Sequence, residues 1–476
     1  MLPTHLKAYI QKALRPREEK SNPRIRASLA SAFLLGICTL GYYSRCPTIS
    51  LQPSLYAEDG TVFLQQAIDQ GMGSLIELYA GYSHLLQRIT ALTAVNFLSP
   101  VSYPLFFLLV AWASYLLPLI STEALIRTGV LGKLMRAAYI PYVYYPYAAE
   151  TYLNLPNSYI FFPLGYIIIS YGVVAKQGGG ELPRVFDSRL TKWLLLIYGL
   201  VSAFTGPFVA IYTIPLLIFH SLRIGRLAIR PVWLSLPILL SCLQIFFSQM
   251  QTFYPLSTVE AAKALLSRPH LLLNWFTVHL ICPLLGGYKA WTYIQTLPQF
   301  KQILIVMSML ALIAIALKVV MRRIAQPGVL ALAVLCTMGL SVSSLLISVR
   351  RGSDLNIMAM IDIGGRFYYW NTILFLSILI MSFIILVQRP RSRFHPACIA
   401  LATWGILTYL NYYNNFAPRP ISASDPTGES NVLIYQKQLE AQCSSSKSLP
   451  IQIFPGPGWS FMLGKSQLAK LCSDLS

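Results

Sequence analysis

Long runs of apolar residues dominate the chain, and short segments in which Lys and Arg collect separate them. A helix that spans a bilayer needs about 20 mainly apolar residues. Positive charge gathers on the cytoplasmic side of a membrane, so the basic loops give each span its direction. On these two rules we expect spans at residues 28–43, 101–122, 138–152, 158–175, 231–250, 301–320, 329–349, 371–388 and 395–413.

The apolar stretch from Trp193 to Phe219 is too long for one plain span, and Thr205-Gly206-Pro207 interrupts it. Proline removes a helical donor and clashes with the preceding turn, so a break is expected there. Two short helices that enter the membrane and return fit the basic residues on both flanks. A single kinked span is the alternative, and it would reverse every later span. With the pair, the chain has about eleven spans.

This threading divides the chain into three parts. Residues 1–27 form a basic cytoplasmic segment, either a helix on the inner membrane surface or a flexible tail. Residues 28–413 form the membrane domain, whose first outer loop, 44–100, contains an interfacial helix near 84–98. Residues 414–476 form a small domain on the outer side. The N-terminus is therefore expected in the cytoplasm and the C-terminus outside.

The outer tail is expected to be a small α/β domain. Its pattern predicts a helix at 429–442, a strand at 450–454 and a second helix near 465–473. Cys443 and Cys472 both lie in this part of the chain, on the side of the membrane where disulfides persist. We therefore predict that these two cysteines pair.

Composition supports the membrane assignment. Hydrophobic residues make up 55% of the 476 residues and charged residues only 11%, whereas soluble domains carry about 25% charged residues. The net charge of +20 lies mainly in short runs between spans, which is unlike a basic groove for nucleic acid. We expect no nucleic-acid partner. Walker A, GxSxG, HExxH and GxGxxG motifs are absent, which argues against an ATP-driven pump, a serine esterase and a Rossmann-type enzyme.

Two adjacent acids, Glu58 and Asp59, stand at the start of a predicted helix just after the first span. Carboxylates near lipid are costly to desolvate unless they are used or paired. Such a pair suits a general base for an acceptor hydroxyl. It equally suits a ligand for Mg²⁺ or Mn²⁺ beside a departing pyrophosphate. The structural alternative is an exposed helix N-terminus, where the helix dipole favours acids.

Basic and aromatic residues offer candidate phosphate ligands. Tyr82, His84 and Arg88 follow in the same loop, and His84 and Arg88 would share one face if the segment is helical. Arginine binds phosphate bidentately, although an interfacial helix can also carry an arginine that snorkels to the surface. Later arginines lie in a loop that the threading places outside, against the charge rule: Arg350, Arg351 and Arg366.

A wrong topology would explain those late arginines, and so would an anionic ligand at the outer face. Arg366 follows two glycines that permit close backbone approach, which favours a ligand there. The aromatic residues beside it are typical of a membrane-interface belt. Weaker candidates lie near the outer ends of other spans, where structural roles are more common: Glu150, Asn157, His279 and Lys289.

This combination resembles the GT-C superfamily of integral membrane glycosyltransferases. The likeness lies in the first-loop acids, the many short or broken spans, the late Arg/Tyr-rich outer loop and the outer tail. It is greatest to bacterial members with motifs like those at residues 56–60, 81–88 and 455–459. The resemblance implies an all-α polytopic fold in a bacterial inner membrane, with a small outer α/β domain.

The resemblance also implies a chemistry. In GT-C enzymes the first-loop acid is catalytic and the donor sugar is carried on a polyprenyl phosphate or pyrophosphate. Asp59 or Glu58 would then act as base or metal ligand. The donor phosphate would bind to one or more of four arginines: Arg88, Arg350, Arg351 and Arg366. Metal dependence stays open, because some members need a divalent cation and others do not.

We therefore expect transfer of a sugar to a cell-surface glycan, lipid or protein. A transporter or flippase of a lipid-linked glycan is the alternative. Such a protein should carry polar groups near the bilayer midplane or inverted repeats. The sequence shows neither, because its polar residues gather at the outer ends of spans. A non-catalytic scaffold would leave the acidic pair unexplained.

Overall fold

The computed structural model describes most of the chain. The described residues are 23–44, 53–79, 82–125, 139, 142, 155–176, 186, 188–224, 232–251, 256–277, 281–285, 293–322, 327–350, 365–387, 431–445, 449–453 and 458–475. The rest of the basic segment, most of the span expected at 138–152 and all of the span expected at 395–413 lie outside them. So do four candidate site residues: Glu150, His279, Lys289 and Arg351.

Helices form where the apolar runs predict them, with ends that shift by a few residues. The membrane-domain helices are α2 (Pro23–Ser44), α6 (Tyr103–Leu125), α9 (Ser158–Lys176), α10 (Arg189–Thr205), α11 (Phe208–Ile224), α12 (Val232–Gln251), α17 (Gln299–Met321), α18 (Pro327–Arg350) and α20 (Gly365–Val387). Between α12 and α17 lie shorter helices: α13 (Thr258–Leu266), α14 (Pro269–Phe276) and α15 (Cys282–Leu284).

Several helices suit a bilayer by length and composition. Within the described ranges, Pro100–Leu125, Gln299–Met321 and Pro327–Leu346 are long and apolar enough to cross one. The pair α10 and α11 would make a fourth if it counts as one span. Shorter apolar helices occur within α2, α9, α12 and α20. The chain is thus a largely helical protein with several helices suited to membrane insertion.

The break expected at Thr205-Gly206-Pro207 is present. Helix α10 ends at Thr205 and α11 begins at Phe208, with a bend of 119° between them. A bend beyond a right angle turns α11 back toward the side from which α10 comes. This geometry favours two helices that enter and return over one kinked span.

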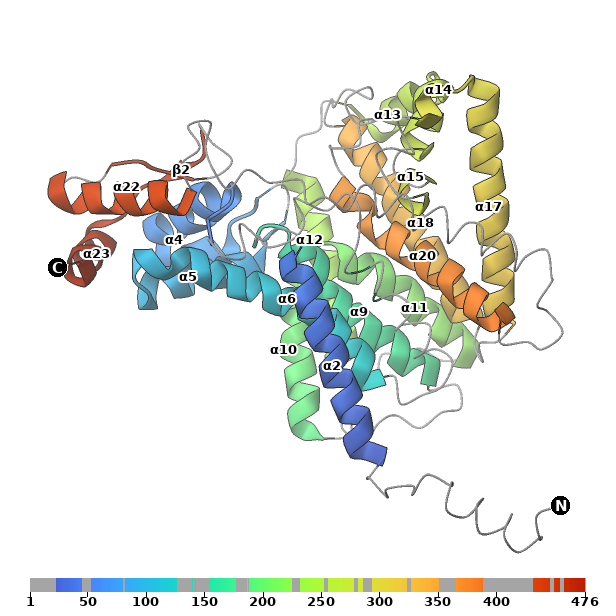
Figure 1. Cartoon of the computed structure of the whole chain (residues 1–476), viewed down its shortest axis with the longest axis horizontal. Helices are drawn as coiled ribbons and strands as arrows, with labels where there is room; N and C mark the ends of the chain where they lie inside the picture. The colour runs from blue at the N-terminus through green and yellow to red at the C-terminus, as the bar shows by residue number, and fades with distance from the viewer. Residues whose placement is uncertain are drawn as a thin grey trace, which may run out of the picture.

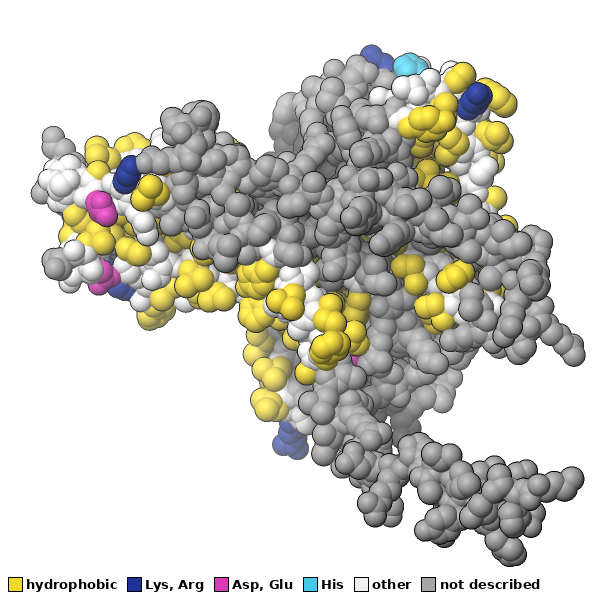
Figure 2. Space-filling model, viewed as in Figure 1, with side chains coloured by type: hydrophobic (Ala, Val, Ile, Leu, Met, Phe, Trp, Pro, Cys, Tyr) yellow, Lys and Arg dark blue, Asp and Glu magenta, His cyan; other side chains and the backbone are white. Residues whose placement is uncertain are grey.

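Apolar side chains cover much of the outer surface. Large exposed residues recur along α2, α10 and α12, including Phe33, Leu40, Trp193 and Phe246. Figure 2 shows hydrophobic side chains gathered over the region where α6 and α10 lie in Figure 1. Soluble monomers rarely expose apolar patches of this kind, so lipid is the surrounding that fits these faces.

The first loop folds into a body beside the membrane helices. Its elements are η1 (Asp59–Leu64), α4 (Gln65–Gln70), η2 (Gly71–Ile76), α5 (Leu85–Phe97) and η3 (Pro100–Ser102). In Figure 1, α5 runs crosswise to α2 and α10. The helix expected near 84–98 is therefore present, in an orientation that suits a membrane surface.

The outward face of α5 carries no charge. Ile89 and Phe97 are exposed. The intervening polar groups bond within the helix: Thr93 Oγ1 donates to the Ile89 carbonyl at 2.7 Å, and Asn96 Nδ2 to the Leu92 carbonyl at 2.8 Å. Polar side chains that are satisfied internally can face lipid.

We expect Phe97→Trp to place an indole in the membrane interface. In proteoliposomes, brominated lipids should quench this added fluorescence strongly. Lys465→Trp, at an exposed position of the tail, is the control and should be quenched little. Equal quenching of the two added tryptophans would show that α5 does not face lipid.

The tail consists of α22 (Asn431–Ser445), β1 (Ile451–Gln452), β2 (Ser460–Phe461) and α23 (Lys465–Leu475). The strands pair antiparallel, with Ile451 opposite Phe461. Both residues belong to one buried cluster with Phe63 and Leu64 of η1 and Tyr103 of α6. The expected helix–strand–helix order is therefore present, and the tail shares its core with the first loop.

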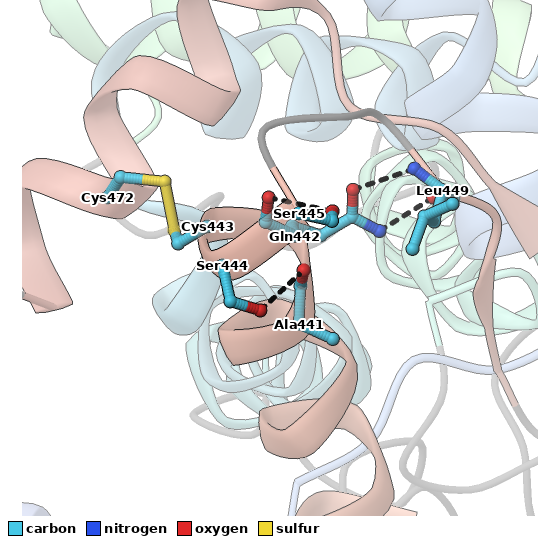
Figure 3. The surroundings of a disulfide bond; sticks show 7 residues. All are labelled: Ala441, Gln442, Cys443, Ser444, Ser445, Leu449 and Cys472. Carbon is cyan, nitrogen blue, oxygen red and sulfur yellow. Dashed lines mark hydrogen bonds between the residues drawn. A yellow bond between two sulfur atoms is a disulfide. The ribbon is translucent and has the colours of Figure 1, made fainter.

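Cys443 and Cys472 form a disulfide that joins α22 to α23, the pairing predicted from the sequence (Figure 3). Beside it, the side-chain amide of Gln442 holds the backbone of Leu449. Gln442 Nε2 donates to the Leu449 carbonyl at 2.7 Å, and the Leu449 amide donates to Gln442 Oε1 at 2.8 Å. Helix, loop and disulfide therefore stabilise one another.

We expect replacement of both cysteines by serine to destabilise the tail by about 3–4 kcal/mol, because the bond closes a loop of 29 residues. Limited proteolysis should then cleave α22 or α23 at protease concentrations that leave the wild type intact. Cys242→Ser, at a free cysteine, should leave the digestion pattern unchanged. A wild-type pattern from the double variant would contradict this prediction.

Candidate acidic site

Asp59 is buried at the first position of η1, with 1% of its surface exposed. Its Oδ2 accepts from the Tyr56 amide at 2.9 Å, and its own amide donates to the Tyr56 carbonyl at 2.8 Å. This double contact closes a turn in which Ala57 has a φ of 41°. A non-glycine residue at positive φ costs energy, so the turn is held by its contacts.

The other carboxylate oxygen, Asp59 Oδ1, has no hydrogen-bond partner among the described residues. Burial raises the pKa of Asp59 well above its ordinary value, and the neighbouring Glu58 raises it further, against a lowering contribution from the Tyr56 amide. A carboxyl group with a raised pKa and a free oxygen can accept a proton from a reacting hydroxyl. Its burial excludes the exposed helix N-terminus.

Glu58 has a different environment from its neighbour. It is half-buried, and its Oε1 accepts a hydrogen bond from the Tyr79 hydroxyl at 3.3 Å. Tyr79 in turn pairs with Tyr82: each backbone amide donates to the other carbonyl, at 2.8 and 3.0 Å. Two adjacent carboxylates in unlike surroundings can take separate roles in one reaction.

The tail packs directly on the residue after Asp59. A Cβ added at Gly60 would lie 2.6 Å from Ile453 Cδ1 and 2.9 Å from Phe461 Cδ1. Such distances are too short for a real side chain, so glycine permits the approach. The strands of the tail therefore help to exclude water from the start of η1.

Hydrogen bonds hold the same contact. The Ser460 amide donates to Thr61 Oγ1 at 3.0 Å, and the Met462 amide donates to Gln65 Oε1 at 2.7 Å. Ser460 of β2 and Met462, which follows the strand, are thus bonded to η1 and α4. The tail and the acidic segment form one packed unit.

His84 lies outside the helix that the sequence predicted for it. Helix α5 begins at Leu85, and His84 precedes it in the left-handed conformation, with φ 50° and ψ 45°. His84 and Arg88 would share one face only if the segment were helical from His84, and the structure does not meet that condition. Aromatic rings surround the imidazole, with centroids 5.7–6.3 Å away: Phe63, Tyr79, Tyr82 and Tyr159.

Arg88 is buried, with 1% of its surface exposed, which excludes the snorkelling interpretation. Its Nε donates to the Ser83 carbonyl and its Nη1 to Gln66 Oε1, both at 2.6 Å. The guanidinium carbon lies 5.8 Å from the centre of the Phe63 ring. Burial lowers the pKa of Arg88, and the negative charge of Glu77 opposes that change.

The segment that contains Asn157 reaches the same region. Asn157 is buried. On α5, Gln87 Nε2 donates to the Pro156 carbonyl and to Ser158 Oγ, each at 3.2 Å. Sequence reasoning missed the supporting residues Gln66, which is half-buried, and Gln87, which is buried, because no motif distinguishes them from surface glutamines.

Arg350 is placed elsewhere. Its Nε donates to the Leu256 carbonyl at 3.3 Å, and its own carbonyl accepts from the Leu256 amide at 3.2 Å. Leu256 shortly precedes α13, which lies on the opposite side of Figure 1 from α4 and α5. The structure thus places Glu58, Asp59, His84 and Arg88 in the same first-loop body, and Arg350 elsewhere. The side chain of Arg366 lies outside the described residues.

The acidic pair alone does not form a complete metal site. Within the described part of the chain, no group of three His, Cys, Asp or Glu side chains could hold a metal ion. A divalent cation bound by Glu58 and Asp59 would need further ligands from substrate oxygens or water. Phosphate oxygens of a donor are suitable ligands of that kind.

No family model, no curated protein and no solved structure matches this chain. The function must therefore be inferred from the chemistry of the site. Its main features are one buried carboxyl with an oxygen that has no partner among the described residues, a half-buried carboxyl beside it, and a tail packed on the next residue, Gly60.

Proposed function

We propose that the chain is a membrane glycosyltransferase of the GT-C type, with about eleven spans and its tail on the outer face. It would transfer a sugar from a polyprenyl-phosphate donor to a hydroxyl of a cell-surface glycan, lipid or protein. The observation that carries this proposal is Asp59: a buried carboxyl with a raised pKa and an oxygen without a partner among the described residues. Such a group is costly to keep without a use.

In this proposal Asp59 Oδ1 takes the proton of the acceptor hydroxyl. The acceptor oxygen then bonds to the anomeric carbon of the sugar as the bond from that carbon to the donor phosphate oxygen breaks. The phosphate leaves with the bonding electrons, so its negative charge grows in the transition state. Positive groups placed there would stabilise it electrostatically, and Arg351 and Arg366 are the candidates.

Glu58 is the second acid of the proposed site. Its half-buried position suits a contact with the acceptor or with a cation that bridges the donor phosphate. The disulfide in the tail supports the outer location of this site, because disulfides persist on that side of the membrane.

The test is transfer from a labelled polyprenyl-phosphate sugar in proteoliposomes. Asp59→Asn should lower kcat by about 100-fold or more, the contribution of a general base, and Glu58→Gln should lower it less. Asp69→Asn, at an exposed aspartate of α4, is the matched control and should retain activity. Full activity in both acid variants would overturn the proposal.

A further inference from the structure

We infer that Arg88 is a positioning residue, which fixes the turn at Ser83–His84 so that Tyr79 meets Glu58. This role differs from that of a donor-phosphate ligand. It rests on the proposed function only for its catalytic consequence, because the structural part stands on contacts within the first loop.

Arg88 donates hydrogen bonds to two consecutive backbone carbonyls. Its backbone amide donates to the His84 carbonyl at 3.1 Å, and its side-chain Nε donates to the Ser83 carbonyl at 2.6 Å. His84 adopts the left-handed conformation there and its own side chain does not cap the helix, while Thr205 Oγ1 accepts from the Leu86 amide at 3.3 Å. A residue before a helix normally adopts the β region, so this turn needs an external restraint, and Arg88 supplies one.

The turn leads directly to the acidic pair. Tyr82 precedes Ser83 and exchanges backbone hydrogen bonds with Tyr79. The Tyr79 hydroxyl then donates to Glu58 Oε1. A chain of contacts therefore runs from the guanidinium through the turn and the tyrosine pair to Glu58. A shift of the turn would move the Tyr79 hydroxyl away from the carboxylate.

The second anchor is Gln66 on α4. Its Oε1 accepts from Arg88 Nη1 at 2.6 Å, and Phe63 lies against the guanidinium. These contacts fix the side chain between α4 and α5. A donor phosphate would meet a group with 1% exposure whose Nε and Nη1 are already bonded to protein, and only the buried Nη2 lacks a partner among the described residues. The arrangement suits a restraint within the fold.

Two substitutions at Gln66 separate the roles. Gln66→Glu keeps an oxygen that accepts from Arg88, whereas Gln66→Leu removes it at similar volume. A positioning role predicts that Gln66→Leu lowers kcat about tenfold with the donor KM unchanged, and that Gln66→Glu stays near wild type. A phosphate-ligand role predicts a raised donor KM in Arg88→Lys and near-normal transfer in Gln66→Leu.

Hydrogen exchange provides a readout that needs no activity. The amides of Tyr79 and Tyr82 bond to each other's carbonyls, so in the wild type they should exchange slowly. They should exchange about tenfold faster in Gln66→Leu and Arg88→Gln, and at the wild-type rate in Gln66→Glu. Unchanged exchange in Gln66→Leu would overturn the inference. Faster exchange in a protein whose wild type transfers no sugar would overturn the proposed function alone.

A double-mutant cycle completes the test. If Arg88 acts through Tyr79, then Tyr79→Phe and Gln66→Leu should together lower kcat little more than either does alone. Independent effects that multiply would show that Arg88 does not act through this tyrosine, and would overturn the inference.

Discussion

Replacement of Asp59 by asparagine is expected to raise the thermal stability of the protein while lowering kcat for sugar transfer by about 100-fold or more. Asparagine has nearly the same shape, and its Oδ1 can accept the hydrogen bond that the Tyr56 amide now gives to Asp59. It removes a carboxylate that burial disfavours. A catalytic residue often leaves the folded protein less stable than the best structural residue at the same position would.

The stability gained by Asp59→Asn should depend on pH, and the direction of that dependence follows from the raised pKa of Asp59. The pKa of Asp59 is raised in the folded protein, so between its ordinary value of 3.8 and the raised value the folded state binds more protons than the unfolded state. The stability of the wild type therefore falls as pH rises through that window. The advantage of the variant should be near zero at pH 4 and grow by up to about 1.4 kcal/mol per pH unit within the window.

Melting temperatures of both proteins in detergent, measured from pH 4 to pH 8, test this expectation. Asp69→Asn, at an exposed position of α4, should change stability by less than about 0.5 kcal/mol at every pH. A constant difference between wild type and Asp59→Asn across the range would mean that Asp59 does not titrate as a buried group.

The helices were predictable from the sequence because the membrane imposes simple rules. Runs of apolar residues marked α6, α17 and α18 within a few residues of their ends. Proline chemistry predicted the break after Thr205, but not the size of the bend, which is 119°. The tail helices and the disulfide of Cys443 with Cys472 could be predicted from local pattern and compartment alone.

The environment of the acidic pair was not predictable in this way. Sequence showed that Glu58 and Asp59 are adjacent, but not that one is buried and the other half-exposed. Nor did it show that Ile453 and Phe461, almost 400 residues later, pack on Gly60, the residue after Asp59. Long-range packing of this kind leaves no periodic signal in the sequence.

Arg88 illustrates a second limit. The spacing placed Arg88 one helical turn after His84. The helix starts only at Leu85, however, and His84 itself adopts the left-handed conformation. The partner of Arg88 is Gln66, a residue type that is common on surfaces. The tyrosines at 79 and 82 flank Ala80 and Gly81, and this spacing of two residues was the one available sign of a tight hairpin.

Substitution of Gly60 by valine should detach the tail from the acidic site. The added atoms would overlap Ile453 Cδ1 and Phe461 Cδ1, which a Cβ alone would approach to 2.6 and 2.9 Å. Overpacking of this kind costs about 1–3 kcal/mol. The clash would displace the tail from η1 and break the hydrogen bonds that Ser460 and Met462 donate to Thr61 and Gln65. Proteolysis of the tail should then become rapid while the membrane helices stay intact.

The same substitution should also change the titration of Asp59, which connects the tail to the chemistry. Water that reaches the carboxyl would return its pKa toward the ordinary value, so the pH-dependent advantage of Asp59→Asn should shrink in a Gly60→Val background. Gly60→Ala with Ile453→Val removes the closer contact but leaves the added Cβ 2.9 Å from Phe461 Cδ1, so it should recover part of the protease resistance. If Gly60→Val leaves both proteolysis and the pH dependence unchanged, the tail does not control the burial of Asp59, and the source of its raised pKa must lie within the first loop.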